Sequence, residues 1–496
     1  MGARTGQQYV ERLAQSRPTV HVHGETLHGG IPDHPAFRNL VATYAGLYDM
    51  QCDPSLRDEM TYRSPSSGER VGCSFLVPAS GEDLVRRRSM MKRWADRSLG
   101  TLGRTGDYLN CALAALGAAG PWFAQADAAF AANIRTYYER VREEDLLLTH
   151  TLIPPQANRS QDAARQQGGG LTARIVREDD NGVVVSGARM LATIGPIADE
   201  MLVFPSTVLK GQPEDAPYSF ALAVSCDAPG LRFICRESLD YGRSHFDHPL
   251  GSRFEEIDAV VVFDEVHVPY ERCFMLGHPE LCNTIYTDTS AIAHMTHQVA
   301  TRTTAKTEAV LGLVSLLAET IGIDSFQHVQ EDIAELIVAL EILRALVRAA
   351  EADAAPNEFG VMTPRLESLN ACRNWFPRVS QRFPQIIRKL GASGLMALPT
   401  EADVAGAAHD DIDRYLQSAT LAGPERVRLF RLAWDMSMSA FAGRQALYEY
   451  YFFGDPVRMA GALVRGYDRG PHIEAVQRFL DDLRDWPPQI GRGGRQ

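Results

Sequence analysis

The spacing of apolar residues changes twice along this 496-residue chain, and that change restricts the possible folds most strongly. In the first third, apolar residues recur at helical intervals, and four such runs lie at 9–13, 84–94, 109–116 and 130–141. The middle contains short runs, several rich in Val and Ile, separated by Gly, Pro, Asn and Asp, a pattern typical of an antiparallel sheet or small barrel. These runs lie at 173–176, 182–185, 200–204, 220–224, 231–234 and 259–263.

The last third returns to helical spacing, and its helices are longer. Between residues 330 and 350 one apolar face is made by Ile333, Leu336, Ile337, Leu340, Leu343 and Val347. A second long helix is predicted to begin at Pro424, since proline is favourable in a first turn, and to continue past Tyr448. Long amphipathic helices of this kind pack as bundles.

The chain is therefore predicted to have three units, which agrees with about 150 residues per domain. We expect an N-terminal helical domain over 1–146, a central antiparallel β-barrel over 147–275 and a C-terminal helical bundle over 276–496. The fold class is α+β, mainly α. The sequence shows no internal repeat.

Charge and targeting signals exclude several kinds of partner. A net charge of -12 argues against nucleic acid or an anionic membrane as the main partner. Polar and charged residues interrupt the first dozen positions, so no signal peptide is predicted. The most apolar stretch, 111–124, is too short for a membrane helix and is broken by Gly120 and Pro121. We expect a cytoplasmic protein.

Cofactor and metal motifs are also absent from the sequence. No strand leads into G-x-G-x-x-G, and there is no phosphate-binding G-x-x-x-x-G-K-[ST] loop. The eight cysteines include no C-x-x-C pair, which predicts free thiols and no metal, iron-sulfur or disulfide site. If the protein uses a redox cofactor, it lacks the usual nicotinamide-binding unit.

Three segments go beyond what composition explains. In the first, residues 103–108, Arg104 and Tyr108 are four apart and would share a face if a helix begins there. A guanidinium and a phenol on one face can hold a phenolic oxygen by charge-assisted hydrogen bonds. The alternative is a solvated arginine beside a core tyrosine.

In the second segment, residues 148–159, His150 follows an apolar run and two prolines then impose an extended path. A histidine in a cleft can exchange a proton near neutral pH, although a lone histidine is more often structural. In the third segment, 441–449, Gly443 costs roughly 1 kcal/mol relative to Ala inside a helix. Close approach of a ligand or a second subunit, with Arg444 facing a phosphate, would explain it; the alternative is a helix-packing glycine.

Taken in order, these segments resemble the 4-hydroxyphenylacetate 3-monooxygenase oxygenase family, and the resemblance runs over nearly the whole chain. Further matching segments lie at 5–9, 187–193, 249–254, 263–269 and 391–394. The resemblance implies an acyl-CoA-dehydrogenase-like fold with a helical N-terminal domain, a central β-barrel and a C-terminal four-helix bundle. It also implies assembly as a homotetramer.

The resemblance assigns roles to individual positions. It places Arg104, Tyr108 and His150 around the phenol oxygen of the substrate, and Ser206 and Thr207 at the substrate's tail. It implies flavin contacts from His150, Thr151, Leu152, Gln156, Ala157, Asn158, Arg159, Thr193, Ala442, Gly443, Arg444 and Gln445.

The activity implied is ortho-hydroxylation of a phenol with O2 and reduced FAD, which a separate NAD(P)H-dependent flavin reductase supplies. Arg104 is expected to provide a permanent positive charge, Tyr108 an oriented hydrogen bond and His150 acid/base chemistry. The 205–207 loop has small hydroxyls and no arginine for a free carboxylate, which favours a carrier-tethered or decorated tyrosine-type phenol over free 4-hydroxyphenylacetate or a chlorophenol. The alternatives are an acyl-CoA dehydrogenase or dehydratase on the same fold, and a non-catalytic helical scaffold.

Overall fold

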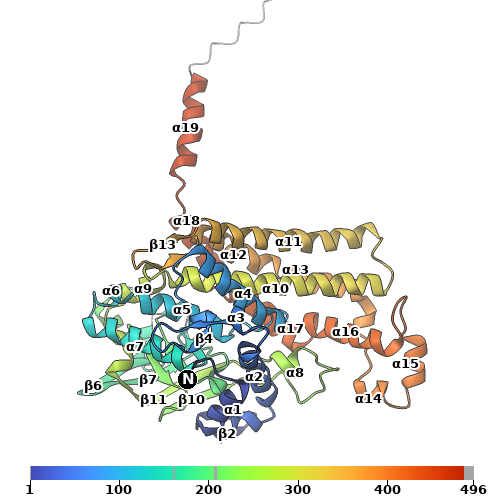
Figure 1. Ribbon diagram of the computed structural model, residues 1–496, viewed down its shortest axis with the longest axis horizontal. Coiled ribbons are helices and arrows are strands. Elements are labelled where there is room, and N and C mark those ends of the chain that lie inside the picture. Colours follow the sequence, from blue (N-terminus) through green and yellow to red (C-terminus); the bar gives the residue numbers. More distant parts are fainter. Residues whose placement is uncertain (1, 159, 162, 206–208, 485–496) are drawn as a thin grey trace, which may run out of the picture.

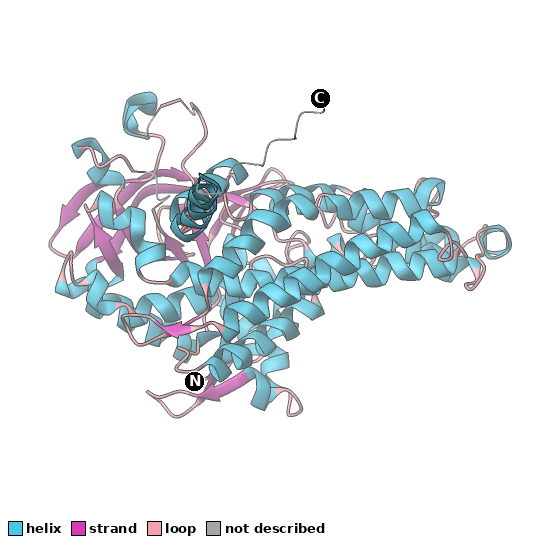
Figure 2. Ribbon diagram, turned by 90° about the horizontal axis from the view of Figure 1, so that it is seen from above, coloured by secondary structure: helices cyan, strands magenta, loops and turns pink. Residues whose placement is uncertain are grey.

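A computed structural model describes residues 2–158, 160–161, 163–205 and 209–484. The strands gather at one end of the molecule, and long helices extend from them to the other end (Figures 1 and 2). This order of helices, sheets and helices along the chain is the one predicted from apolar spacing.

The first part of the chain is mainly helical and confirms the four predicted helices with longer bounds. Its helices are α1 (Gly6–Gln15), α2 (Arg38–Cys52), α3 (Arg57–Met60), α4 (Gly81–Arg97), α5 (Gly106–Ala118), α6 (Gly120–Phe123) and α7 (Ala128–Glu144), and its strands are β1 (Thr19–Val22), β2 (Glu25–His28), β3 (Thr61–Arg63) and β4 (Arg70–Gly72). Capping boxes begin two of the helices, Thr5 with Gln8 at α1 and Ser80 with Asp83 at α4.

The middle contains the six predicted strands and two more, β5 and β12. The elements are β5 (Leu148–Thr151), β6 (Arg174–Asp179), β7 (Gly182–Arg189), β8 (Glu200–Val203), β9 (Phe220–Ser225), β10 (Leu231–Cys235), α8 (Gly251–Phe254), β11 (Ala259–Pro269) and β12 (Cys273–Leu276). They form a six-stranded sheet in the order β2-β1-β10-β11-β7-β6 and a four-stranded sheet in the order β12-β9-β8-β5. An isolated bridge between Ile153 and Met190 connects the two sheets.

Most strand pairs are antiparallel, as predicted, but β1 with β10 and β5 with β8 are parallel. Parallel pairs arise where the partner strand lies far away in the sequence, and β1 comes from the segment predicted to be a separate helical domain. The boundaries near 146 and 276 remain predictions.

The last part of the chain is helical. Its elements are α9 (Pro279–Asp288), α10 (Ala291–Thr320), α11 (Gln327–Ala352), β13 (Ala355–Pro356), β14 (Met362–Thr363), α12 (Leu366–Val379), α13 (Arg382–Gly391), α14 (Glu401–Val404), α15 (His409–Tyr415), α16 (Gly423–Ser437), α17 (Ala440–Tyr451), α18 (Pro456–Gly466) and α19 (Gly470–Arg484). Helix α10 packs against α11 and α12 and against α4 and α5 of the first part.

The prediction of one continuous helix from Pro424 past Tyr448 is wrong. Helix α16 ends at Ser437, and the Ser439 hydroxyl accepts a hydrogen bond from the Ala442 N–H at 3.1 Å to begin α17. A serine that caps a backbone N–H ends one helix and begins another. The break turns α17 so that its inner face meets α10 and the loop before α5.

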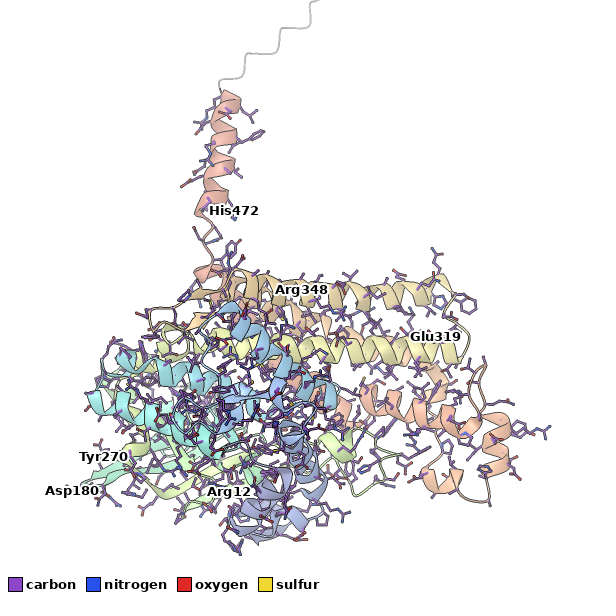
Figure 3. The ribbon with its side chains drawn as sticks, viewed as in Figure 1. Arg12, Asp180, Tyr270, Glu319, Arg348 and His472 are labelled. Atoms are coloured by element: carbon purple, nitrogen blue, oxygen red, sulfur yellow. The ribbon has the colours of Figure 1, made fainter. Side chains whose placement is uncertain are left out.

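Helix α19 extends away from the body, as Figures 1 and 3 show, the latter with His472 labelled. Within the described ranges, no helix combines the length and apolarity needed to cross a bilayer. The eight cysteines are free, and no cluster of three potential metal ligands occurs in the part of the chain that the structure describes.

Candidate active site

Arg104, Tyr108 and His150 come together where α5 meets β5. The Arg104 guanidinium carbon lies 4.6 Å from the centroid of the Tyr108 ring, and the Tyr108 and His150 rings are 5.8 Å apart. Arg104 does not share a helical face with Tyr108, because α5 begins only at Gly106 and Arg104 lies in the preceding loop. The expected proximity therefore arises from a loop and a first turn rather than from helical spacing.

Tyr448 of α17 and Phe452, the residue that caps the end of α17, form another wall of this cluster. The Arg104 guanidinium carbon is 4.5 Å from the ring centroid of Phe452 and 5.6 Å from that of Tyr448, and Phe452 lies 5.5 Å from Tyr108. Sequence reasoning missed this wall. The four-residue spacing of Arg444, Tyr448 and Phe452 was the available signal, since such residues share a helical face.

Burial controls the protonation of the two titratable groups that face Arg104. Burial raises the pKa of the Tyr108 hydroxyl above its ordinary value, although the positive charge of Arg104 opposes this shift. Burial, reinforced by Arg104, lowers the pKa of His150 well below its ordinary value. His150 is therefore a neutral imidazole at neutral pH.

Three polar atoms around this cluster have no partner. Nη1 of Arg104, Nδ1 of His150 and Oη of Tyr448 are buried, and none has a hydrogen-bond partner among the described residues. An unsatisfied buried polar group costs about 1–3 kcal/mol, so three in one place indicate a site for a polar ligand.

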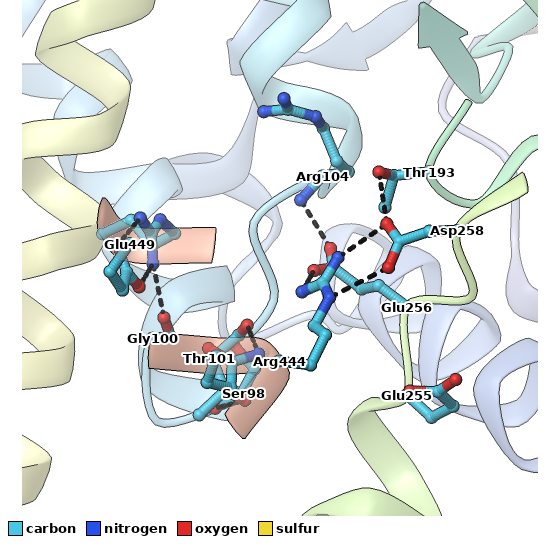
Figure 4. A network of polar contacts seen from close by, with 12 residues as sticks. Ser98, Gly100, Thr101, Arg104, Thr193, Glu255, Glu256, Asp258, Arg444 and Glu449 are labelled. Atoms are coloured by element: carbon cyan, nitrogen blue, oxygen red, sulfur yellow. Dashed lines mark hydrogen bonds and ion pairs between the residues drawn. The ribbon is translucent and has the colours of Figure 1, made fainter. Parts of the chain in front are cut away.

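On the other side of Arg104 lies a network of buried charges that contains two predicted flavin contacts, Thr193 and Arg444 (Figure 4). The Thr193 hydroxyl donates to Asp258 Oδ1 at 2.7 Å. Arg444 pairs with Asp258 at 3.0 Å and with Glu256 at 3.1 Å. Glu256 in turn accepts the backbone N–H of Arg104 at 2.6 Å.

These ion pairs fix the charges of the network. Burial alone would lower the pKa of Arg444, but the carboxylates of Asp258 and Glu256 outweigh it and raise the pKa well above its ordinary value. Burial would raise the pKa of Asp258, but Arg444 and Arg236 lower it well below its usual range. Two carboxylates therefore neutralise Arg444, and its expected contact with a flavin phosphate remains a prediction.

The four predicted flavin contacts of α17 lie on two faces. Ala442 and Gly443 line an open hollow of about 360 Å³ between α13 and α17. A Cβ added at Gly443 would meet nothing within 4 Å, so space for a ligand exists there. Gln445 faces inward with Arg444 and donates to the Thr101 carbonyl at 2.9 Å.

The predicted contacts from Thr151, the last residue of β5, to Asn158 are spread along an increasingly exposed segment. The Thr151 hydroxyl donates to the Met190 carbonyl at 2.9 Å, and the Leu152 carbonyl accepts from Arg189 at 2.7 Å. Gln156, Ala157 and Asn158 are exposed. Arg159, and Ser206 and Thr207 of the substrate-tail loop, lie outside the described residues.

These observations fit a flavin beside a phenol site. The unpartnered Nδ1 of His150, the Thr193 hydroxyl and the open space at Gly443 are suited to a ligand with many hydrogen-bonding groups. The helical first part, paired sheets and long C-terminal helices form an acyl-CoA-dehydrogenase-like fold. An archaeal 4-hydroxybutyryl-CoA dehydratase shares it at a TM-score of 0.86, covering 100% of this chain and 97% of its own, and at 19% identity the likeness is one of fold alone.

The family is narrower than the fold. The N-terminal and C-terminal models of 4-hydroxyphenylacetate 3-hydroxylase match residues 5–275 and 282–481, so the chain belongs to that family. It is 48% identical to the 4-hydroxyphenylacetate 3-monooxygenase oxygenase component of Geobacillus sp. (strain PA-9), covering 97% of both chains.

Two further comparisons bear on ligands. A crystal structure of a 4-hydroxyphenylacetate 3-monooxygenase oxygenase component with FAD and 4-hydroxyphenylacetate is similar at a TM-score of 0.93 and 46% identity, covering 97% of this chain and 99% of the other. A Streptomyces globisporus monooxygenase that acts on a (3S)-3-amino-3-(3-chloro-4-hydroxyphenyl)propanoyl group on a peptidyl-carrier protein is 31% identical, covering 91% of this chain and 85% of its own.

Proposed function

We propose that this chain is the oxygenase component of a two-component monooxygenase that hydroxylates a phenol beside its hydroxyl group. In this proposal a separate NAD(P)H-dependent flavin reductase supplies reduced FAD. Reduced FAD, when bound, supplies the two electrons with which one atom of O2 enters the phenol ring and the other leaves as water. We further propose a cytoplasmic homotetramer.

One observation carries the proposal: the Arg104 guanidinium lies over the Tyr108 ring, which contacts His150, and its buried Nη1 has no partner among the described residues. A phenol reacts at its ortho carbon far more readily as phenolate, so a charge that stabilises the anionic oxygen accelerates hydroxylation. In a buried site that charge acts with little screening.

His150 and Tyr108 complete the phenol site. The neutral imidazole of His150 offers an unpartnered Nδ1 that can accept the phenolic proton. The Tyr108 hydroxyl stays protonated, since burial raises its pKa, and can donate a hydrogen bond to the resulting oxygen anion. The proposed flavin contacts are Thr193, the segment after His150 and the outer face of α17.

Identity to relatives favours a free phenol over a carrier-bound one. The chain shares 48% of its residues with an oxygenase named for 4-hydroxyphenylacetate and 31% with the carrier-protein enzyme. We therefore place a 4-hydroxyphenylacetate-like phenol first, and a carrier-tethered tyrosine-type phenol second.

The test combines the purified chain with a flavin reductase, NADH, FAD and 18O2. 4-Hydroxyphenylacetate should give 3,4-dihydroxyphenylacetate with one labelled oxygen, and omission of the reductase should abolish product. The methyl ether 4-methoxyphenylacetate is the matched control and should stay unchanged, because it cannot form a phenolate. Product only from tyrosyl-carrier protein would select the second substrate class, and no hydroxylated product from any phenol would overturn the proposal.

A further inference from the structure

The loop that carries Arg104 is held by side chains from distant parts of the chain. The Arg104 N–H donates to Glu256 Oε1 at 2.6 Å, and its carbonyl accepts from the Tyr44 hydroxyl at 3.1 Å. Gln445 of α17 donates to the Thr101 carbonyl of the same loop at 2.9 Å. Because Arg104 precedes α5, these contacts replace the helical hydrogen bonds that would otherwise fix its position.

Two charged side chains contact this loop. Arg302 donates to the Gly100 carbonyl at 2.9 Å, and Glu256 binds Arg104 itself and reaches a second element. While Oε1 accepts from Arg104, Oε2 pairs with Nη1 of Arg444 at 3.1 Å. Arg444 binds both oxygens of Asp258, and Asp258 accepts the Thr193 hydroxyl. Figure 4 shows this continuous path, which runs from the phenol side at Arg104 to the predicted flavin side at Thr193.

Burial of the Glu256 carboxylate costs free energy, which its hydrogen-bond and ion-pair partners must offset. Its side chain is 0% exposed. A buried carboxylate is stable only when paired and hydrogen-bonded, and it then imposes a defined geometry on its partners. The short segment between α8 and β11 is thereby tied to both α17 and the Arg104 loop.

We propose that Glu256 is a positioning residue for hydroxylation, which holds the Arg104 loop in register with the turn after β7 that carries Thr193. This inference rests on the proposed function. A displacement of about 1 Å in a catalytic group can reduce a rate about a hundredfold, so the register matters even though Glu256 touches neither substrate nor flavin.

The chain provides a matched control in the neighbouring residue. Glu255 is also buried, pairs with Arg236 at 2.5 Å and accepts the Leu239 N–H at 3.2 Å. The described contacts of its side chain do not include the Arg104 loop. Its partner Arg236 also donates to Asp258 and to the Glu256 carbonyl, each at 3.0 Å. Glu255→Gln therefore removes a comparable buried charge from the same network, while both Glu256 carboxylate oxygens keep their partners.

Two variants separate the functions of Glu256. Glu256→Gln keeps one acceptor oxygen, which can serve the Arg104 N–H or Arg444 but not both in the native geometry. Glu256→Ala removes both. We expect kcat to fall about tenfold in the first and about a hundredfold in the second, with a smaller change in KM, and with more hydrogen peroxide released per reduced FAD consumed.

A flavin-free measurement provides the second readout. The visible absorbance of 4-nitrophenol reports its ionisation, so a pH titration of the bound probe gives its pKa. The wild-type protein and Glu255→Gln should lower that pKa equally. Both Glu256 variants should shift it back towards the value of free 4-nitrophenol, because the guanidinium no longer faces the probe in a fixed place. Thermal unfolding identifies any variant that fails to fold. If Glu256→Ala does not fold, Glu256→Gln alone is compared with the wild-type protein and Glu255→Gln.

The outcomes distinguish the inference from the function on which it rests. If the wild-type protein neither makes a catechol nor lowers the pKa of bound 4-nitrophenol, the proposed function fails. If the wild-type protein does both, and folded Glu256→Gln matches Glu255→Gln in kcat and in probe pKa, Glu256 has no positioning role.

Discussion

Arg104→Met is the most direct perturbation of the proposed chemistry, because methionine keeps a long flexible side chain and removes the charge. The guanidinium carbon lies 4.6 Å from the Tyr108 ring centroid and 4.5 Å from that of Phe452, so an oxygen anion in this cluster would lie close to the charge. A unit charge pair about 4 Å apart interacts with about 4 kcal/mol at an effective dielectric constant near 20.

An independent comparison gives a similar magnitude. Removal of one preorganised donor from an oxyanion site costs about 2.7–4 kcal/mol in the barrier. Both arguments predict that kcat/KM of Arg104→Met falls about 100-fold to 1,000-fold. Arg104→Lys should fall less, since it keeps the charge but lacks the planar fork of donors.

The assay measures catechol formation from 4-hydroxyphenylacetate with reduced FAD supplied by the reductase. Arg365→Met is the control, because Arg365 is half-exposed and pairs with Asp353 at the surface. It should leave kcat/KM unchanged. Near-wild-type kcat/KM in folded Arg104→Met, or equal losses in the Met and Lys variants, would refute the electrostatic role.

Three further predictions concern stability, protonation and ligand space. Burial would raise the pKa of Glu449, but two buried cations lower it from 4.5 to about 2. The ionised carboxylate therefore stabilises the fold above pH 4.5, and this stabilisation is lost as the pH falls towards 2. Glu449→Gln should therefore lower the free energy of unfolding at neutral pH, measured in urea, by about 3 kcal/mol, and a loss below about 1 kcal/mol would contradict this. His150 should show the NMR signature of neutral imidazole at pH 6, and a protonated ring there would show that burial does not control it. Gly103→Ala should destabilise the fold by about 1–3 kcal/mol, because its Cβ would lie 2.0 Å from Tyr448 Oη. Gly443→Ala should instead keep the fold and weaken FAD binding, because its Cβ would enter the open space there. Unchanged FAD affinity would remove Gly443 from the flavin site.

Local sequence patterns predicted the helices and strands that depend mainly on residues close together in the sequence. The runs at 182–185 and 259–263 are rich in valine and bounded by turn residues, and they form the first halves of β7 and β11. Strand β5 was missed, because Leu148–Thr151 is fully buried on both faces and shows no alternation. Its parallel partner β8 begins about 50 residues later, so a local pattern cannot report the pairing.

The break between α16 and α17 escaped prediction for a similar reason. Apolar residues continue at helical spacing through Trp434, Phe441 and Tyr448, and this periodicity hides the interruption. The signal was the serine at 439, which prefers a cap over a helix interior because its hydroxyl competes for backbone hydrogen bonds.

The sequence also indicated some residues of the site and missed others. Arg104, Tyr108 and His150 could be selected as a set because the family resemblance supplied their spacing, and the structure brings them together. Glu256 and Asp258 carry no such motif. Their significance depends on partners more than 150 residues away along the chain, which only the folded protein reveals.

The arginines near α17 differ in how their charge is balanced. Arg444 pairs with Glu256 and Asp258, and Arg302 pairs with Glu449 at 2.7 Å. Lys306 shares Glu449 with Arg302 at 2.7 Å, so both arginines lie within one contact of a carboxylate. The Arg104 guanidinium instead faces aromatic rings, whose attraction to a cation is weaker than that of a carboxylate. We therefore expect Arg104 to stabilise an anionic substrate oxygen more than a neutral one, since the described residues place aromatic rings and no carboxylate against its guanidinium.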